Sequence, residues 1–233
     1  MLFLNLLEGL PLQTRVELGS SIQTLFAKTF VQKFKNAKII AISPSSSQRE
    51  DVIIDFAGQP LQFEVKARLR PFSTNIVYEK TLRKDQNDPI FDAFADSFSK
   101  GKFQSFSELM NFYKQNIDPR VGFPGEKGTP SSGKIPSEFK TDDASFLEQL
   151  RVVSMQRFQE KGDNYFVIYD HSDKNFYIFH TGFGPNPLKA GPFPHFDFVK
   201  VDTYGGAYKG GMRVAFKAIV DTYQGSPFVL PSK

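Results

Sequence analysis

The sequence predicts an α/β protein with a mixed central sheet flanked by helices and with additional β-hairpins in the C-terminal half. Three observations predict this class. Segments with helical apolar spacing alternate with short strand-like runs, but imperfectly, which favours a mixed sheet over a purely parallel one. Turn-forming residues separate several pairs of strand-like runs, as hairpins require. The chain has 233 residues, 40% of them hydrophobic, which is enough for one large domain with its own core.

The first elements are a helix, a short strand and a hairpin. A helix is predicted over residues 12–35 because apolar residues there lie near helical spacing: Leu18, Ile22, Leu25, Phe26 and Phe34. An apolar run at 39–42 predicts a strand. Residues 51–56 and 61–69 predict two further strands, because the turn sequence Ala57-Gly-Gln-Pro60 separates them.

The middle of the chain is predicted to be helical. Asp88-Pro89 is a strong start signal, a capping aspartate with proline at the first helical position. Ser105-Phe-Ser-Glu108 has capping-box form and predicts a helix through about Gln115. Residues 122–140 combine prolines and glycines with lysines, and we expect a flexible loop there.

The last part of the chain is predicted to hold one long helix and two hairpins. The helix covers residues 142–161 and ends at Gly162. The first hairpin pairs residues 165–169 with 176–180. The second pairs strands near 196–203 and 212–221 across a glycine-rich connection.

Composition excludes several classes of site. The chain has no cysteine, so disulfides, cysteine-ligated zinc and a cysteine nucleophile are all excluded. His171, His180 and His195 are widely spaced and fit no metal-ligand pattern, and no phosphate-binding glycine motif occurs. The net charge of +4 permits a polyanionic partner without requiring one. With no signal-peptide pattern and no bilayer-length apolar run, we expect a cytoplasmic protein that does not enter a membrane.

The segment from Leu61 to Arg70 alternates strictly between apolar and polar residues. Gln62, Glu64, Lys66, Arg68 and Arg70 share one face, because successive side chains on a strand point to opposite sides. If Gly58 and Gln59 are the central residues of a two-residue turn, Asp51 lies opposite Lys66 and diagonal to Glu64 on that face.

Two carboxylates beside a lysine predict a metal site. Mg²⁺ prefers oxygen ligands, often one or two carboxylates together with water and a substrate phosphate. A lysine can orient the attacking water or stabilise developing negative charge. The alternative is a half-exposed strand whose charges are only solvated. Asp55 lies on the same face and competes with Asp51 as the metal ligand.

Asp51-Val-Ile-Ile, followed thirteen residues later by Glu64-Val-Lys66, resembles the PD-(D/E)xK nuclease superfamily over roughly residues 12–100. The resemblance implies a restriction-endonuclease-like core, with Asp51 and Glu64 as ligands of Mg²⁺, for which Mn²⁺ substitutes, and with Lys66 as a catalytic residue. Glu17 matches the glutamate that many members carry on the first helix. One departure is that Glu50, not proline, precedes Asp51.

The resemblance further implies a sequence-specific double-strand DNA endonuclease, similar to type II restriction enzymes and acting as a homodimer. The chain would form a single nuclease domain over residues 1–233. Its core would span about residues 12–100, and residues 142–233 would supply recognition and dimerisation surfaces. The alternatives are a structure-selective (junction or repair) or homing nuclease of the same superfamily, and a non-catalytic DNA-binding protein.

Four basic residues are further candidates for DNA binding. Arg68 and Arg70 continue the polar face beyond Lys66, where they would contact phosphates flanking the cut. Lys209 and Arg213 flank paired glycines that would let the backbone approach DNA closely. For each of these residues, ordinary solvent exposure is the competing interpretation.

Overall fold

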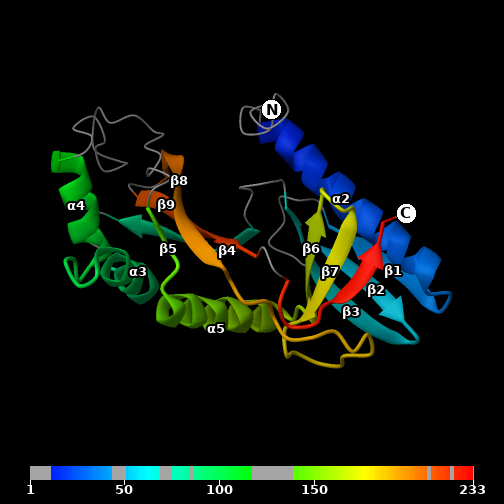
Figure 1. Cartoon of the computed structure of the whole chain (residues 1–233). Helices are drawn as coiled ribbons and strands as arrows, with labels where there is room; N and C mark the ends of the chain where they lie inside the picture. The colour runs from blue at the N-terminus through cyan, green and yellow to red at the C-terminus, as the bar shows by residue number, and fades with distance from the viewer. Residues whose placement is uncertain are drawn as a thin grey trace. The chain divides into compact units, whose positions relative to one another are not determined.

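The computed structural model describes residues 12–43, 51–68, 75–83, 87–116, 139–208, 211–220 and 223–232. For some of these, Glu17 and Arg213 among them, only the backbone is described. The chain divides into two compact units (Figure 1). Unit 1 combines Met1–Asn75, Val153–His195 and Thr222–Lys233, and unit 2 combines Ile76–Val152 with Phe196–Asp221.

Unit 1 is built on a six-stranded mixed sheet with the strand order β1-β2-β3-β6-β7-β10. Strands β3 and β6 at its centre run parallel, and the neighbouring pairs that flank them are antiparallel. The α/β class with a mixed sheet is therefore confirmed. The strands of this sheet are β1 (Ala37–Ile42), β2 (Val52–Phe56), β3 (Gln59–Arg68), β6 (Tyr165–Asp170), β7 (Asn175–His180) and β10 (Phe228–Pro231).

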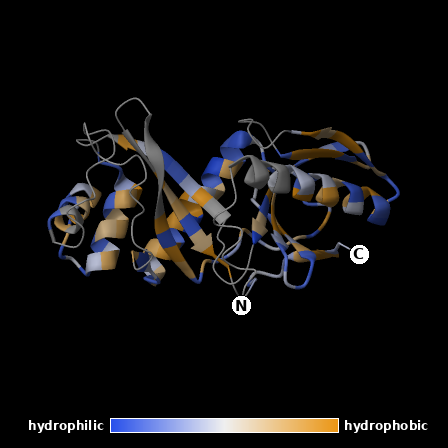
Figure 2. Ribbon diagram, turned by 90° about the horizontal axis from the view of Figure 1, so that it is seen from above, coloured by the Kyte–Doolittle hydropathy of each residue, from blue (hydrophilic) through white to orange (hydrophobic). Residues whose placement is uncertain are grey.

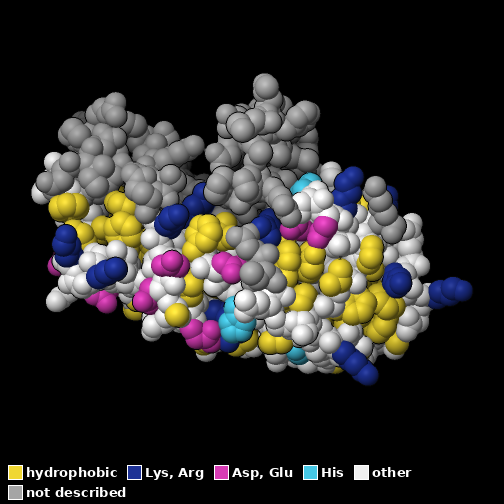
Figure 3. Space-filling view, viewed as in Figure 1, with side chains coloured by type: hydrophobic (Ala, Val, Ile, Leu, Met, Phe, Trp, Pro, Cys, Tyr) yellow, Lys and Arg dark blue, Asp and Glu magenta, His cyan; other side chains and the backbone are white. Residues whose placement is uncertain are grey.

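Helix α2 (Leu12–Lys33) packs on one face of this sheet through a core dominated by phenylalanine. Phe26 and Phe30 are fully buried, and both rings lie close to Phe63 of β3. Each strand sends alternate residues into this core, so the residues between them point to the opposite face. Figure 2 shows apolar stretches along the strands of both units, and Figure 3 shows that hydrophobic and charged side chains mix on the visible surface.

The β2–β3 hairpin has a different register from the one predicted. Its turn residues are Ala57 and Gly58, whose φ angles of 55° and 84° match a type I′ turn. The partners next to the turn are Phe56 and Gln59, and Asp55 lies opposite Pro60. The predicted turn would have put Pro60 in the pair that exchanges both backbone hydrogen bonds, which proline cannot do because it has no N–H. The observed register shifts every pairing by two residues, so the same side chains still share one face.

Unit 2 is built on a four-stranded sheet with the order β4-β9-β8-β5. One face packs against α3, whose Phe91 and Phe94 both lie close to Phe216 of β9. Asp88 caps α3 by accepting hydrogen bonds from the Ile90 and Phe91 amides, as Asp88-Pro89 predicts. The elements of unit 2 are β4 (Asn75–Arg83), α3 (Pro89–Ser99), α4 (Phe106–Asn116), β5 (Lys140–Thr141), the first half of α5 (Ala144–Lys161), β8 (Phe198–Tyr208) and β9 (Gly211–Ile219).

Within the described residues, three strands were not predicted: β4, β5 and β10. The middle of the chain was expected to be helical, but β4 forms there because it pairs with β9, about 130 residues later in the chain. The sheet that carries Glu64, and whose strand β2 begins just after Asp51, also takes strands from the second half of the chain. Most of the expected loop at 122–140 lies outside the described residues, although Lys140 itself belongs to β5. No helix in the described ranges has the length and hydropathy of a membrane span.

Candidate functional site

Asp51, Glu64 and Lys66 meet on the face of the unit 1 sheet opposite α2. The observed hairpin register, continued by one residue, places Asp51 opposite Glu64 and diagonal to Lys66. Asp51 directly precedes β2, and its carbonyl oxygen accepts a hydrogen bond of 2.9 Å from the Ser43 amide. Its Oδ2 accepts a hydrogen bond of 2.8 Å from the Val65 amide. Backbone contacts on both sides therefore fix Asp51 next to β3.

Lys66 lies between the two carboxylates. Its Nζ is 3.6 Å from Asp51 Oδ2 and forms a close ion pair with Glu64 Oε1. The side chain of Glu64 is 6% exposed and that of Asp51 is 13% exposed. Two nearly buried carboxylates thus share one cation, which is the convergence that the sequence predicted for this face.

A second lysine joins the site from α5 and was not foreseen from the sequence. Lys161 is the last residue of α5, and its Nζ is 3.3 Å from Glu64 Oε2. Its sequence position just before Gly162 marks a helix end, but nothing local relates it to a strand about a hundred residues earlier. We call Asp51, Glu64, Lys66 and Lys161 the Asp51 cluster.

The pKa values of the two carboxyl groups in the Asp51 cluster are shifted in opposite directions. Burial raises the pKa of Asp51, and although Lys66 opposes this effect, the nearby charge of Glu64 adds to it. Burial would also raise the pKa of Glu64, but Lys66 and Lys161 outweigh it, so that pKa lies below its ordinary value. The pKa of Lys66 is raised, since its two carboxylate neighbours overcome the cost of burial. Glu64 is therefore the more firmly ionised carboxylate.

The donor set fits a hard divalent cation. Asp51 and Glu64 both approach one point, which the Lys66 ammonium contacts, so a cation near that point would reach both carboxylates. Within the described residues, no hydrogen bond or ion pair engages Asp51 Oδ1. The same residues hold no group of three or more His, Asp or Glu side chains suited to a metal. Two carboxylates completed by water and substrate oxygens are a usual set for Mg²⁺.

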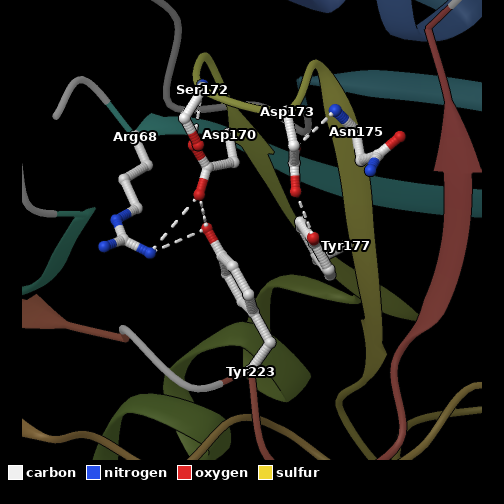
Figure 4. Close-up of polar contacts among 7 residues, drawn as sticks. All are labelled: Arg68, Asp170, Ser172, Asp173, Asn175, Tyr177 and Tyr223. Atoms are coloured by element: carbon white, nitrogen blue, oxygen red, sulfur yellow. Dashed lines mark hydrogen bonds and ion pairs between the residues drawn. The ribbon is translucent and has the colours of Figure 1, made fainter.

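A second polar group, the Arg68 cluster, lies on the same sheet face and consists of Arg68, Asp170, Ser172 and Tyr223 (Figure 4). Arg68 Nη1 lies 3.4 Å from Asp170 Oδ2 and donates to Tyr223 Oη at 3.0 Å. Tyr223 Oη donates to Asp170 Oδ2 at 2.5 Å, and Ser172 donates to Oδ1 through its amide and its hydroxyl. The Tyr223 ring stacks on Tyr177 with centroids 3.7 Å apart.

The structure places Arg68 differently from the sequence prediction. A phosphate contact was expected at an exposed strand end, but Arg68 is only 7% exposed and is paired within unit 1. The physical reason is that β6 runs parallel to β3 and brings Asp170 opposite Arg68. Sequence alone could not reveal this pairing, because the two residues are 102 positions apart.

The other predicted residues divide into two groups. Asp55, the competitor of Asp51, belongs to the turn, where its Oδ1 accepts a hydrogen bond of 2.7 Å from the Gly58 amide. It lies opposite Pro60, four residue pairs along the hairpin from the position where Asp51 faces Glu64. The remaining candidates fall outside what is described: Arg70 and Lys209 entirely, and Glu17 and Arg213 in their side chains.

Comparisons with known proteins add little to this geometry. No protein-family model and no curated protein matches the chain. Among solved structures, the chain is similar to the HhaI endonuclease in complex with DNA, with a TM-score of 0.36 and 10% sequence identity over 90% of this chain and 88% of that one. A TM-score this low carries no argument about fold or function, and no family membership is shown. The functional conclusion therefore depends on the Asp51 cluster itself.

Proposed function

We propose that this protein is a divalent-metal-dependent endodeoxyribonuclease whose active site is the Asp51 cluster. The observation that supports this most strongly is that Asp51 and Glu64, on neighbouring strands, both contact Lys66 on the sheet face opposite the α2 core. A bound divalent metal accelerates phosphodiester hydrolysis by activating water and by placing positive charge near the phosphate. Two converging carboxylates could hold such a metal, and a lysine supplies further positive charge.

Each residue of the cluster has a distinct part in the proposed reaction. Asp51 and Glu64 would hold Mg²⁺ or Mn²⁺, which when bound lowers the pKa of coordinated water and polarises the phosphate. Lys66 would donate hydrogen bonds to the attacking water or to a phosphate oxygen, where negative charge develops. Lys161 would keep the Glu64 carboxylate oriented through its contact with Oε2. Burial of both carboxylates strengthens these interactions, because water screens them less.

The finer proposal is a sequence-specific enzyme that cuts both strands of duplex DNA as a homodimer. Cutting a palindromic site on both strands requires two active sites, which a twofold dimer provides. The resemblance of Asp51-Val-Ile-Ile and Glu64-Val-Lys66 to the PD-(D/E)xK motif supports this choice, as does the substantial part of the chain outside the motif.

The test is digestion of supercoiled plasmid by the purified protein with Mg²⁺, with Mn²⁺ and with EDTA, followed by sequencing of the ends. The proposal expects metal-dependent cleavage and a discrete set of ends. Cleavage of branched substrates in preference to plasmid would identify a structure-selective nuclease instead. Binding of duplex DNA without cleavage under any metal condition would contradict the enzymatic assignment and favour a non-catalytic DNA-binding protein.

A further inference from the structure

The position of Lys161 is built into the turn that ends α5. Gly162 follows it in the left-handed conformation, with a φ angle of 88°, and the Gly162 amide donates to Gln159 O at 2.9 Å. The Asp163 amide donates to Phe158 O at 3.0 Å. These two hydrogen bonds form the Schellman motif, in which a helix ends at a glycine. The backbone at Lys161 is therefore held in one conformation.

The same turn is attached to β3 beside Glu64. The Asn164 amide donates to Gln62 O at 3.0 Å, and the Gln62 amide donates to Asn164 Oδ1 at 2.8 Å. A Cβ atom on Gly162 would lie only 3.0 Å from Gln62 Oε1, so the turn packs closely against the strand. Lys161 Nζ lies 3.3 Å from Glu64 Oε2. The contact between Lys161 and Glu64 thus depends on a backbone that is anchored on both sides.

Two lysines divide the Glu64 carboxylate between them. Lys66 contacts Oε1 and Lys161 contacts Oε2. Asp51 Oδ2 accepts from the Val65 amide, whereas no hydrogen bond or ion pair within the described residues engages Asp51 Oδ1. If Lys66 shifts for a cation, Oε1 becomes available and Oε2 stays with Lys161. One ion would therefore reach both carboxylates, and a second ion would find Oε2 already neutralised.

The charges of the Asp51 cluster also favour a single ion. Two carboxylates and two ammonium groups sum to zero, so one divalent ion brings the cluster to +2 and two ions would bring it to +4. Ions in two-metal sites lie roughly 3.5–4 Å apart, where they repel each other about four times as strongly as unit charges do. In the part of the chain that the structure describes, no third His, Asp or Glu joins these carboxylates to offset that charge.

We propose that the Asp51 cluster holds one divalent cation and that the Lys161 ammonium supplies the positive charge that a second ion would otherwise supply. The inference rests on the proposed function and deepens it, because it fixes the number of ions and gives Lys161 a part beyond orienting Glu64. In two-metal sites both ions stabilise negative charge on the reacting oxygens. The Lys161 side chain is 33% exposed, so its charge is open to a phosphate that enters the site.

The test counts the Mn²⁺ ions bound per chain in the intact protein without DNA, from the electron paramagnetic resonance signal of free Mn²⁺. Lys161→Gln removes the charge and Lys161→Arg keeps it. Lys33→Gln is the matched control, because Lys33 is also the last residue of a unit 1 helix and is exposed. Single-turnover cleavage of plasmid at saturating Mn²⁺ is measured for the same proteins, and melting temperatures check that each variant folds.

The expected result is that metal affinity and cleavage move in opposite directions in Lys161→Gln. Wild type, Lys161→Arg and Lys33→Gln should each bind one Mn²⁺ with similar affinity. Lys161→Gln should bind Mn²⁺ about tenfold more tightly, since a unit charge roughly 5 Å from a divalent ion weakens its binding by about that factor even at the dielectric constant of water. Its cleavage rate constant should nevertheless fall by about tenfold, because the charge that acts on the phosphate is gone.

The outcomes that would overturn the inference differ from the outcome that would overturn the nuclease site. Two Mn²⁺ ions per wild-type chain would contradict the single ion and leave the nuclease standing. Mn²⁺ binding in Lys161→Gln that is no tighter than in wild type, or an unchanged cleavage rate, would show that Lys161 only orients Glu64. A folded wild-type protein that binds no Mn²⁺ would contradict the metal site of the proposed function and this inference with it.

Discussion

Two polar clusters lie on the same face of the unit 1 sheet, two residues apart on β3, and differ in what neutralises their carboxylates. In the Arg68 cluster, Asp170 is 1% exposed and both of its oxygens accept from protein donors. In the Asp51 cluster, the partners of Glu64 are two lysine ammonium groups, whose side chains are 28% and 33% exposed.

From this difference we infer that the Arg68 cluster is structural and that the Asp51 cluster is the proposed metal site. Fixed hydroxyl, amide and guanidinium donors leave Asp170 little capacity for a metal. The Lys66 ammonium can shift away from Glu64 Oε1 when a cation arrives, at a cost that cation–carboxylate contacts offset, while Lys161 keeps its contact with Oε2. The same strand would thus carry catalysis at Glu64 and Lys66, and structural stabilisation at Arg68.

Removing either carboxylate of the Asp51 cluster should have the largest effect. Asp51→Asn and Glu64→Gln should each lower plasmid cleavage with Mg²⁺ by more than about 100-fold, the loss that even outer partners of metal ligands cause. Asp55→Asn is the matched control, because Asp55 serves the turn, and it should keep most activity. An inactive Asp55 variant beside an active Asp51 variant would reverse the assignment of the ligand.

Removing the Lys66 charge should reduce catalysis and preserve metal binding. Lys66→Ala should lower the cleavage rate constant by about 10²–10³-fold, as loss of one donor to developing charge does in other enzymes. Lys161→Ala should have a smaller effect, since its only salt bridge within the described residues is to Glu64. Single-turnover cleavage rates and metal titrations of both variants provide the measurement. Loss of metal binding in Lys66→Ala would contradict its catalytic role.

Breaking the Arg68 cluster should affect stability rather than metal chemistry. Arg68→Met or Asp170→Asn leaves the other residue of the pair buried and charged without an opposite charge beside it. Either substitution should therefore lower the free energy of unfolding by about 3 kcal/mol. Asp173→Asn, an exposed neighbour on the same turn, should change it by less than about 0.5 kcal/mol. Denaturant unfolding measures both values. If Arg68→Met or Asp170→Asn weakened the free energy of metal binding by as much as the free energy of unfolding, the two clusters would not be independent.

The smallest expected effect is on the pH dependence of stability. Burial would raise the pKa of Asp170, but hydrogen bonds from Ser172 and Tyr223 and the charge of Arg68 bring it below its ordinary value. A lowered folded-state pKa stabilises the protein above the ordinary carboxyl pKa, and this contribution disappears as the pH falls through the folded-state value. The difference in unfolding free energy between wild type and Asp170→Asn should therefore shrink below about pH 4. A constant difference down to the acid limit would contradict this account.

The sequence predicted more of the Asp51 cluster than of its surroundings. Strict alternation from Leu61 onward put Glu64 and Lys66 on one face, and the structure has them there with Asp51. The predicted hairpin register was wrong by two residues, but a shift of two leaves the same side chains on the same face. Pro60 could have corrected it, since proline cannot occupy a hydrogen-bonded position beside the turn.

The contacts that were missed join residues far apart in the sequence. Lys161 reaches Glu64 across 97 positions, and Asp170 reaches Arg68 across 102. Both depend on the parallel pairing of β3 with β6, which follows a long crossover and leaves no local signal. The strand β4 was missed for the same reason, because its neighbour β9 comes from the far end of unit 2.

The most direct test of the central claim is a Mn²⁺ titration, without DNA, of four proteins: wild type, Glu64→Gln, Asp55→Asn and Asp170→Asn. The account predicts that wild type, Asp55→Asn and Asp170→Asn bind Mn²⁺ with similar affinity and that Glu64→Gln loses binding. Equal Mn²⁺ affinity in Glu64→Gln and wild type, or loss of binding in Asp55→Asn or in a folded Asp170→Asn, would contradict a metal site built on Asp51 and Glu64.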